Sequence, residues 1–483
     1  MESGAQINSE HSLRHLWHHL SLPEVALDSI HLPNANSRLP SSFKIGVLAQ
    51  SSIALTALLA ALVHSIRNKS QVVPRTTVSG EHAVVEFKSE RLYMIDGEIG
   101  RPPWGAIGGL HKSADGHVRV HDGFPVHRDG ARALLGCSAE ADRAEVGAKI
   151  AEWNSVELET AAFDAGIVIS ALRSYAQWDI LPQAKAVHDF PIIVRKIADG
   201  PVGLHKHVAG AGADKCLQGL RVVEMSRVIA TPVAGKTLAA HGADVLWVTS
   251  PTLPDQPGLD RDLGRGKRTI RLDIKVEEEK EKLFELVDSA DVFLQGFRPG
   301  SLASRGLSSA ELAARCPQGI ICANMSAYGP EGPWKEKRGF DSLVQTCSGM
   351  NVSEAEHHGK GEAALPMPCQ ALDHAGGYFL AAGILTALYR QATEGGSYQV
   401  DVSLAGVMKY LRSLGQYPGD SGFQCKDFDT QYDVPENCLE ERESAFGLLK
   451  SVRHSASIEG VSVGWDVMPK PLGSDKAEWL SHS

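Results

Sequence analysis

The chain lacks the features that mark several common protein classes. Its eight cysteines are scattered, with no Cys-x-x-Cys pair and no Cys/His ligand spacing. The sequence therefore predicts a reducing compartment, no structural zinc and no metal site. Lys and Arg number 48 against 58 Asp and Glu, a net charge of −10. This balance leaves no basic face for nucleic acid, so local positive groups must hold any anionic ligand.

The chain also shows no secretory signal, because its first residues are polar and rich in histidine. One uncharged run, 45–66, is about long enough to cross a bilayer. Gln50, Thr56 and His64 dilute that run, so we predict a buried helix and no membrane contact. We expect a cytoplasmic protein. The terminal Ser481-His482-Ser483 is only distantly similar to a peroxisomal address, and peroxisomal or mitochondrial locations stay open.

The composition is that of a globular protein, with 43% apolar and 22% charged residues. A length of 483 residues predicts two or three domains. Between 217 and 413, short apolar runs alternate with helical patterns. This alternation predicts an α/β fold with a doubly wound, Rossmann-like, mostly parallel sheet and a smaller α+β domain. The expected strands are 220–226, 243–248, 290–297 and 319–325, and the expected helices are 232–241, 275–289 and 309–315.

Asp373 is the most informative residue. It precedes the long apolar stretch 378–389, and Ala375, Gly376 and Gly377 beside it would let a substrate or another backbone approach closely. A carboxylate at the start of a buried helix is costly to desolvate, which favours a functional role. The alternative is a helix cap, as Asp often is. Local sequence alone favours the cap.

A weak internal repeat links two parts of the chain. Residues 46–87 align with 372–411, so that 57–62 faces 383–388. In this register Val47 takes the place of Asp373. If the repeat is real, the first copy has lost its carboxylate and cannot perform the same chemistry.

Nine short stretches in the ordered section resemble, in the family's own order, the class III CoA-transferases. This family, of CaiB/BaiF type, includes formyl-CoA transferase, carnitine CoA-transferase and α-methylacyl-CoA racemase. Each stretch is weak alone, but nine in order over about 190 residues is a strong signal. They are 220–228, 241–245, 265–268, 272–275, 297–300, 328–333, 338–341, 373–377 and 399–403.

The resemblance implies an unusual layout. Residues 1–40 are an N-terminal extension, and 41–200 resemble a degenerate copy of the family's second half, including a small-domain strand at 114–120. Residues 201–216 form a Gly- and His-rich linker, 217–413 the large domain with the catalytic Asp, and 414–483 a shortened C-terminal part. The N-terminal copy would supply the small domain that the C-terminus lacks. The family's interlocked homodimer is expected, although this rearrangement makes its assembly uncertain.

By position, Asp373 matches the family's catalytic aspartate. The resemblance implies that this carboxylate attacks an acyl-CoA and passes CoA to an acid acceptor through anhydride and aspartyl-CoA intermediates. It implies CoA thioester and carboxylic acid substrates and no permanently bound cofactor. The residues that match or lie near CoA-contacting positions are Val228, Lys275, Phe297 and Arg338, with Lys267 and Arg268 as further basic candidates. Arg298 and Arg305 are more consistent with solvated surface charges, and Ile229 and Ser250 depart from the polar and basic residues that the family can have there.

Two other functions stay open. A racemase would need a His where this chain has Phe340, and Phe cannot exchange a proton, which favours transfer. A non-catalytic CoA-binding protein would fit the rearranged halves. Asp341 reads as a cap or hydrogen-bond acceptor, and His374 as a packed neighbour rather than a base.

Overall fold

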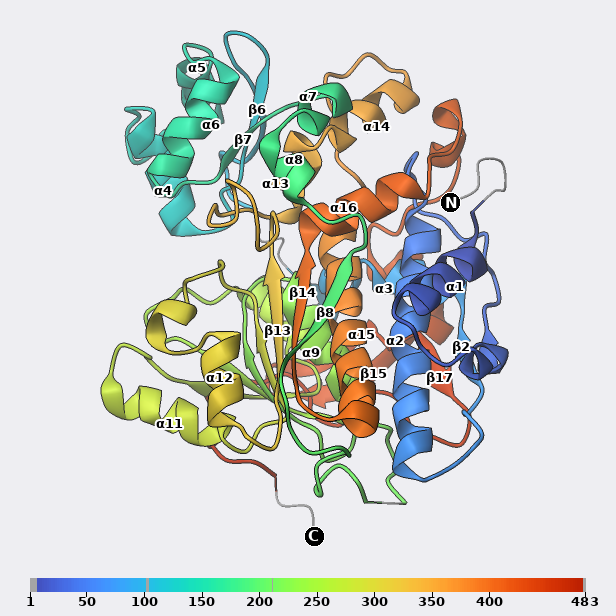
Figure 1. Ribbon diagram of the computed structural model, residues 1–483. Helices are drawn as coiled ribbons and strands as arrows, with labels where there is room; N and C mark the ends of the chain where they lie inside the picture. The colour runs from blue at the N-terminus through green and yellow to red at the C-terminus, as the bar shows by residue number, and fades with distance from the viewer. Residues whose placement is uncertain (1–6, 101–103, 211, 481–483) are drawn as a thin grey trace.

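A seven-stranded sheet forms the centre of the protein (Figure 1). The computed structural model describes residues 7–100, 104–210 and 212–480, so the terminal tripeptide 481–483 lies outside the described residues. The strand order is β11-β10-β9-β12-β13-β14-β8; six strands are parallel and β8 runs antiparallel to β14. The strands are β8 (Ile192–Ala198), β9 (Arg221–Met225), β10 (Asp244–Thr249), β11 (Lys267–Arg271), β12 (Val292–Gln295), β13 (Ile321–Ser326) and β14 (Ser397–Ser403).

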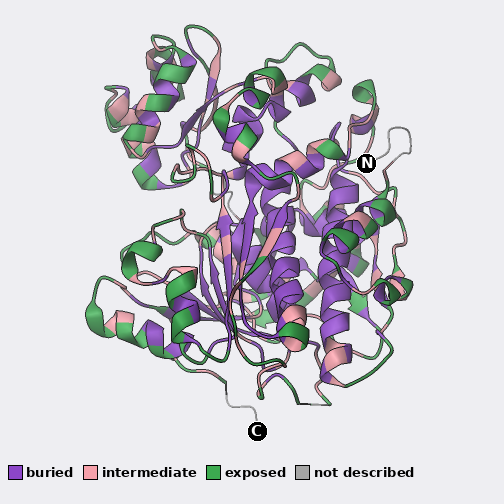
Figure 2. Cartoon of the chain, in the orientation of Figure 1, coloured by how far each residue is buried: buried purple, intermediate pink, exposed green. Residues whose placement is uncertain are grey.

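Helices cover both faces of this sheet. Alternate strand residues point to opposite faces, so Val222 and Val245 join one apolar cluster while Val223 and Leu246 join another. The first cluster includes α9 (Ala230–Ala240), α15 (Ala371–Glu394) and α2 (Ile45–Arg67); the second includes α11 (Glu277–Val287) and α12 (Ser309–Arg315). Figure 2 shows the sheet and the long helices as one buried block. The predicted mixed α/β architecture with a mostly parallel sheet is confirmed.

Helices α2 and α15 lie side by side in the core (Figure 1). Both are long and apolar enough to cross a membrane, yet the most apolar window of each is wholly buried within the fold. The prediction that 45–66 forms a buried helix is confirmed. Their burial against each other and the sheet explains why both are apolar on every side.

A small α+β unit lies beside the carboxyl ends of the large sheet (Figure 1). Its sheet, β5-β6-β7, carries its own apolar core with three helices. The predicted strand at 114–120 is present as β6, and the β-branched run 167–169 leads into the strand β7. The elements are β5 (Gly109–Lys112), β6 (His117–Val120), β7 (Ile169–Ala171), α4 (Pro125–Leu134), α5 (Arg143–Ile150) and α6 (Ser155–Asp164).

Segments from the two ends of the chain share two further sheets. Strand β2 (Thr76–Val78) pairs with β1 (Ile30–His31) and with β17 (Ala456–Ile458), and β3 (Met94–Ile95) pairs with β4 (Glu98–Ile99) and with β16 (Gly447–Val452), which also pairs with β15 (Leu439–Ser444). Residues 41–200 and 414–480 therefore fold onto each other and onto the large sheet. The remaining helices are α1 (Ser9–His19), α3 (Gly80–Glu86), α7 (Tyr175–Asp179), α8 (Pro182–Ala186), α10 (Pro257–Leu263), α13 (Asp341–Cys347), α14 (Met350–His358) and α16 (Leu404–Ser413).

Candidate functional site

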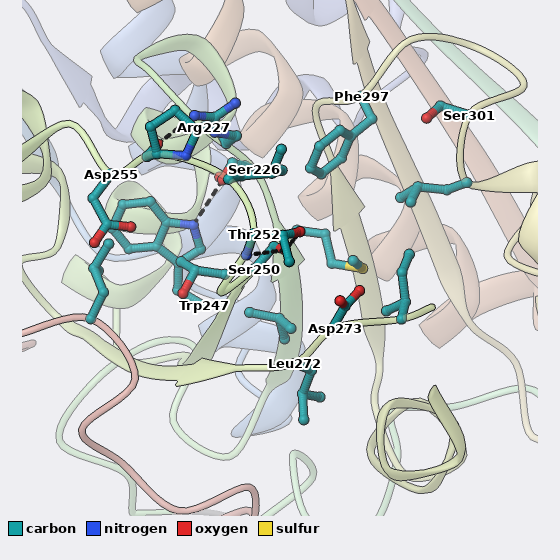
Figure 3. A pocket seen from close by; sticks show the side chains of 18 of the residues that line it. Ser226, Arg227, Trp247, Ser250, Thr252, Asp255, Leu272, Asp273, Phe297 and Ser301 are labelled. Atoms are coloured by element: carbon teal, nitrogen blue, oxygen red, sulfur yellow. Dashed lines mark hydrogen bonds between the residues drawn. The ribbon is translucent and has the colours of Figure 1, made fainter. Parts of the chain in front are cut away.

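Two neighbouring cavities open at the carboxyl ends of the parallel strands. The strand order reverses between β9 and β12, and ligands of open α/β sheets bind where such a reversal occurs. The first cavity, of about 270 Å³, is lined by Ser226 and Arg227 after β9, Trp247 on β10 and Phe297 after β12 (Figure 3). The second, of about 500 Å³, shares Arg227 and Phe297 with the first and also reaches Asp373. The switch point of the sheet thus leads to the predicted nucleophile.

Asp373 lies in the first turn of α15 and is 6% exposed. Among the described residues, none donates a hydrogen bond to its carboxylate, which lines the second cavity. Burial, with the nearby charges of Asp341 and Glu90, raises the pKa of Asp373 well above its ordinary value. The carboxylate is thus left open to a substrate in a site that favours its neutral form.

The helix is capped by Asp341 rather than by Asp373. Asp341 Oδ2 accepts the backbone N–H groups of Leu372 and Asp373, at 2.8 and 3.1 Å, and Gln345 donates to its other oxygen. The cap alternative for Asp373 is therefore wrong, and the prediction that Asp341 is a hydrogen-bond acceptor is confirmed. Burial raises the pKa of Asp341 to about 6, despite these donors. Asp341 fixes the backbone that carries Asp373.

His374 is packed away from the second cavity. Its Nε2 donates to Glu90, at 2.8 Å, and its ring stacks on Phe87 with centroids 5.4 Å apart. Glu90 also accepts from Arg91 Nε at 2.9 Å. This confirms the packed-neighbour interpretation of His374. No sequence signal pointed to Glu90, because it lies far from Asp373 along the chain and only folding brings the two together.

Four of the six predicted CoA contacts line the two cavities. Val228 and Phe297 border both, Lys275 the first and Arg338 the second. Val228 has φ +70°, a left-handed backbone that a β-branched residue rarely adopts, so the turn after β9 is strained where the cavities meet. The other positions singled out in the sequence also border a cavity. Ser250 and Arg305 line the first cavity, and Ile229, Arg298 and Phe340 line the second.

Lys267 and Arg268 are placed elsewhere, which corrects their prediction as CoA contacts. Lys267 Nζ lies 2.8 Å from Glu224 Oε1, and both side chains are fully buried. Arg268 is bonded to both carboxylate oxygens of Asp244, at 2.8 Å. Burial lowers the pKa of Lys267. In the sequence, Lys267 and Arg268 lie in a short basic segment. In the structure they begin the buried strand β11, where each cation compensates a buried carboxylate.

The small α+β unit contributes residues to the second cavity that sequence reasoning missed. His127 lines it, is 6% exposed, and its Nδ1 has no hydrogen-bond partner among the described residues. Its ring lies edge-on to Phe340, with centroids 6.0 Å apart, and His121 stacks on the same Phe340 at 4.0 Å. Burial, then Arg338 and Arg227, lower the pKa of His127 to about 4. Neutral imidazoles therefore surround Phe340.

Arg227 is held by the same unit. Its guanidinium carbon lies 4.3 Å from the centre of the Phe124 ring, a cation–π contact, and it also donates to the Pro254 carbonyl. Arg227 borders both cavities. The N-terminal part of the chain thus helps to build the site at the edge of the large sheet.

Residues 217–419 match the model of CoA-transferase family III. This segment, which is less than half of the chain, resembles the family III CoA-transferases. It contains β9 to β14, Asp341 and Asp373, and so carries most of the geometry described above.

Curated relatives are similar to about two fifths of the chain. Acetyl-coenzyme A transferase nodX of Hypoxylon pulicicidum is 36% identical over 205 residues, covering 42% of this chain and 34% of that protein. Probable fatty acyl-CoA transferase Rv3272 of Mycobacterium tuberculosis is 33% identical over 212 residues, covering 41% and 53%. Its solved structure covers 42% of this chain and 58% of that one, with 31% identity and a TM-score of 0.38. The chain therefore spans from about a third to about half the length of these curated relatives.

Proposed function

We propose that this chain transfers CoA from an acyl-CoA thioester to a carboxylic acid, with Asp373 as the nucleophile. One observation carries the proposal: a buried carboxylate that accepts no hydrogen bond from the described residues lines a cavity adjoining the switch point of the sheet. Relatives named formyl-CoA:oxalate CoA-transferase and cinnamoyl-CoA:phenyllactate CoA-transferase, 31% identical over 211 residues and 32% identical over 201 residues, support the reaction class.

The proposed reaction needs no redox step and no further reagent. A carboxylate oxygen of Asp373 attacks the acyl carbon of the donor. The C–S bond breaks, CoA departs as the thiolate, and a mixed anhydride between Asp373 and the acyl group is formed. The thiolate then attacks the aspartyl carbonyl, which releases the donor acid and leaves aspartyl-CoA. The acceptor carboxylate attacks that thioester, expelling thiolate and forming a second anhydride. The thiolate then attacks the acceptor-derived acyl carbon of this second anhydride, which gives the new acyl-CoA and restores the carboxylate of Asp373. The nucleophile divides one exchange into easier steps.

The environment of Asp373 suits this sequence in two ways. Burial keeps water from an anhydride that would otherwise hydrolyse. The raised pKa means that the free carboxyl group holds its proton to a higher pH than usual. Attack requires the ionised form, so transfer activity should rise with pH through this raised pKa and be lost below it.

We further propose that CoA lies across the first cavity, with its phosphates near Lys275 and its adenine against Phe297, while Val228 and Arg338 contact the part nearer Asp373. In this arrangement 41–200 acts as the family's small domain, and two copies of the chain assemble as a homodimer. Lys275 and Lys267 give a matched test of this CoA position, because only Lys275 lines the first cavity. Lys275→Met should raise KM for acyl-CoA about tenfold, as loss of one charged hydrogen bond would. Lys267→Met should instead destabilise the fold by about 3–5 kcal/mol, because it leaves Glu224 buried and unpaired.

Trapping of the acyl enzyme tests the proposed function. Wild-type protein is incubated with an acyl-CoA and hydroxylamine, and peptides are read by mass spectrometry for a hydroxamate at Asp373. Asp373→Asn should lose trapping and transfer while keeping CoA binding. Asp129→Asn, at an exposed carboxylate on α4, serves as the control. CoA binding without trapping or exchange in the wild type would instead support the non-catalytic alternative, and α-deuterium wash-in at an enzymatic rate would support racemisation.

A further inference from the structure

Two histidines of the linker meet a buried carboxylate at the amino end of the large sheet. His205 Nδ1 contacts Asp291 Oδ1, and His207 Nε2 lies 3.0 Å from each Asp291 oxygen. The three ligand atoms lie within 4.8 Å of one another, the only such trio of His, Cys, Asp or Glu among the described residues. Asp291 is 2% exposed, whereas the two histidine side chains are 21% and 27% exposed. The carboxylate is therefore buried, while both imidazoles are partly open to solvent.

The hydrogen bonds around the trio leave a place for a cation. His205 Nε2 lies 3.0 Å from the carbonyl oxygen of Gln318, which can only accept, so Nε2 carries the proton. In the neutral imidazole, Nδ1 then has a lone pair facing the Asp291 carboxylate. Two lone pairs in contact repel unless a cation lies between them. That cation is either a proton, making His205 an imidazolium, or a metal ion.

The surroundings are those of a metal site with oriented ligands. Metal-binding imidazoles commonly donate their second N–H to a backbone carbonyl, as His205 does to Gln318, and ligating carboxylates are themselves hydrogen-bonded. Asp291 Oδ2 accepts the backbone N–H of Arg221 at 2.7 Å. The backbone is also fixed, because Gly219 leaves the space into which the His207 carbonyl packs: a Cβ there would lie 2.1 Å from that oxygen.

We propose that His205, His207 and Asp291 bind one Zn²⁺ ion, with water as the fourth ligand. Two imidazoles and a carboxylate suit zinc, and tetrahedral ligands at zinc lie about 3.3 Å apart. The 3.0 Å separations between His207 and Asp291 therefore need a small opening, and the shorter contact between His205 and Asp291 needs a larger one. Binding releases the protons that His205 and His207 otherwise share with Asp291. The site lies at the amino ends of β9 and β12, at the edge opposite the two cavities. It would fasten the linker to the sheet and take no part in CoA transfer.

Zinc titration of the metal-stripped full-length protein tests the site. Competition against a chromogenic chelator at pH 7.5 should give one Zn²⁺ per chain with a Kd of about 1 µM or tighter. His205→Gln and His207→Gln should each weaken binding by about 100-fold. Co²⁺ in place of zinc should give the visible absorption of a four-coordinate site. His188→Gln, which removes an exposed histidine 3.9 Å from Glu331, is the matched control and should leave binding unchanged.

The stability of the fold gives a second readout. Zinc should raise the Tm of the wild type and of His188→Gln, but not that of His207→Gln, which alters a part-exposed side chain and should still fold. Binding weaker than about 100 µM in the wild type, or tight binding that survives both His205→Gln and His207→Gln, would overturn the proposal and leave protons as the cations of this cluster. The measurement needs no acyl-CoA, so its outcome is independent of the proposed function.

Discussion

The two long helices at the centre of the molecule, α2 and α15, are alike in almost everything except their first turns. They have 23 and 24 residues, lie side by side and are buried along most of their length. Helix α15 begins with Asp373, supported by the Asp341 cap. Helix α2 has Val47 at the aligned position and no side-chain cap at Lys44. The carboxylate of α15 thus lines a cavity, whereas Val47 at the start of α2 lies in the apolar core.

The largest expected effect comes from removing the charge at α15. Asp373→Asn is nearly isosteric but cannot form an anhydride, so the transfer rate should fall by about 10³-fold or more. CoA exchange between an acyl-CoA and an isotopically labelled acid, followed by mass spectrometry, measures it. Thermal unfolding should change little. Retention of a tenth of the activity would show that the carboxylate of α15 is not the nucleophile.

The reciprocal change at α2 sharpens the comparison. Val47 is 5% exposed within the apolar core, and no cap like Asp341 is present at Lys44. Val47→Asp should therefore lower the free energy of unfolding by about 3 kcal/mol, because it buries a carboxyl group in the apolar core, whereas Asp373 lines a cavity. Val47→Ala, which removes volume without adding charge, is the control and should cost less. Denaturant unfolding gives both values. An equal loss in the two variants would show that burial of charge is not what separates the helices.

Asp341→Asn tests the charge next to the nucleophile. The substitution keeps an oxygen acceptor for the two N–H groups that start α15, and removes a negative charge that raises the pKa of Asp373. With that charge gone, the pKa of Asp373 falls, and the acidic limb of the pH–activity profile should move to lower pH. Activity at high pH should drop only severalfold. An unmoved limb would mean that burial alone sets this pKa.

A smaller shift in the same direction is expected from Glu90→Gln. Glu90 also raises the pKa of Asp373, but less than Asp341 does. It is further compensated by Arg91 and His374. The acidic limb should therefore move by less than in Asp341→Asn, with some loss of Tm because one acceptor is lost. A larger shift than that of Asp341→Asn would reverse the order of the two carboxylates.

The features that were predictable from sequence are those that local pattern determines. The alternating strands and helices of 217–413 gave the large sheet, and the uncharged run gave α2. Partnerships between distant residues were not predictable. Lys267 was expected to contact CoA, but its side chain is buried against Glu224 on β9, two strands away in the sheet. Strand β8 carries a mixed apolar and basic sequence, and its pairing with β14 joins residues about 200 positions apart. His127 reached the cavity only because the α+β unit folds against Phe340.

The side-by-side packing of α2 and α15 has a consequence for synthesis of the protein. Helix α2 leaves the ribosome roughly 300 residues before α15 is complete. At about 5–20 residues per second, that interval lasts from about 15 seconds to a minute. Throughout it, an apolar helix that would satisfy a membrane-insertion test is without its partner. We therefore predict that slowing translation between the two helices lowers the yield of soluble protein, because α2 stays exposed for longer.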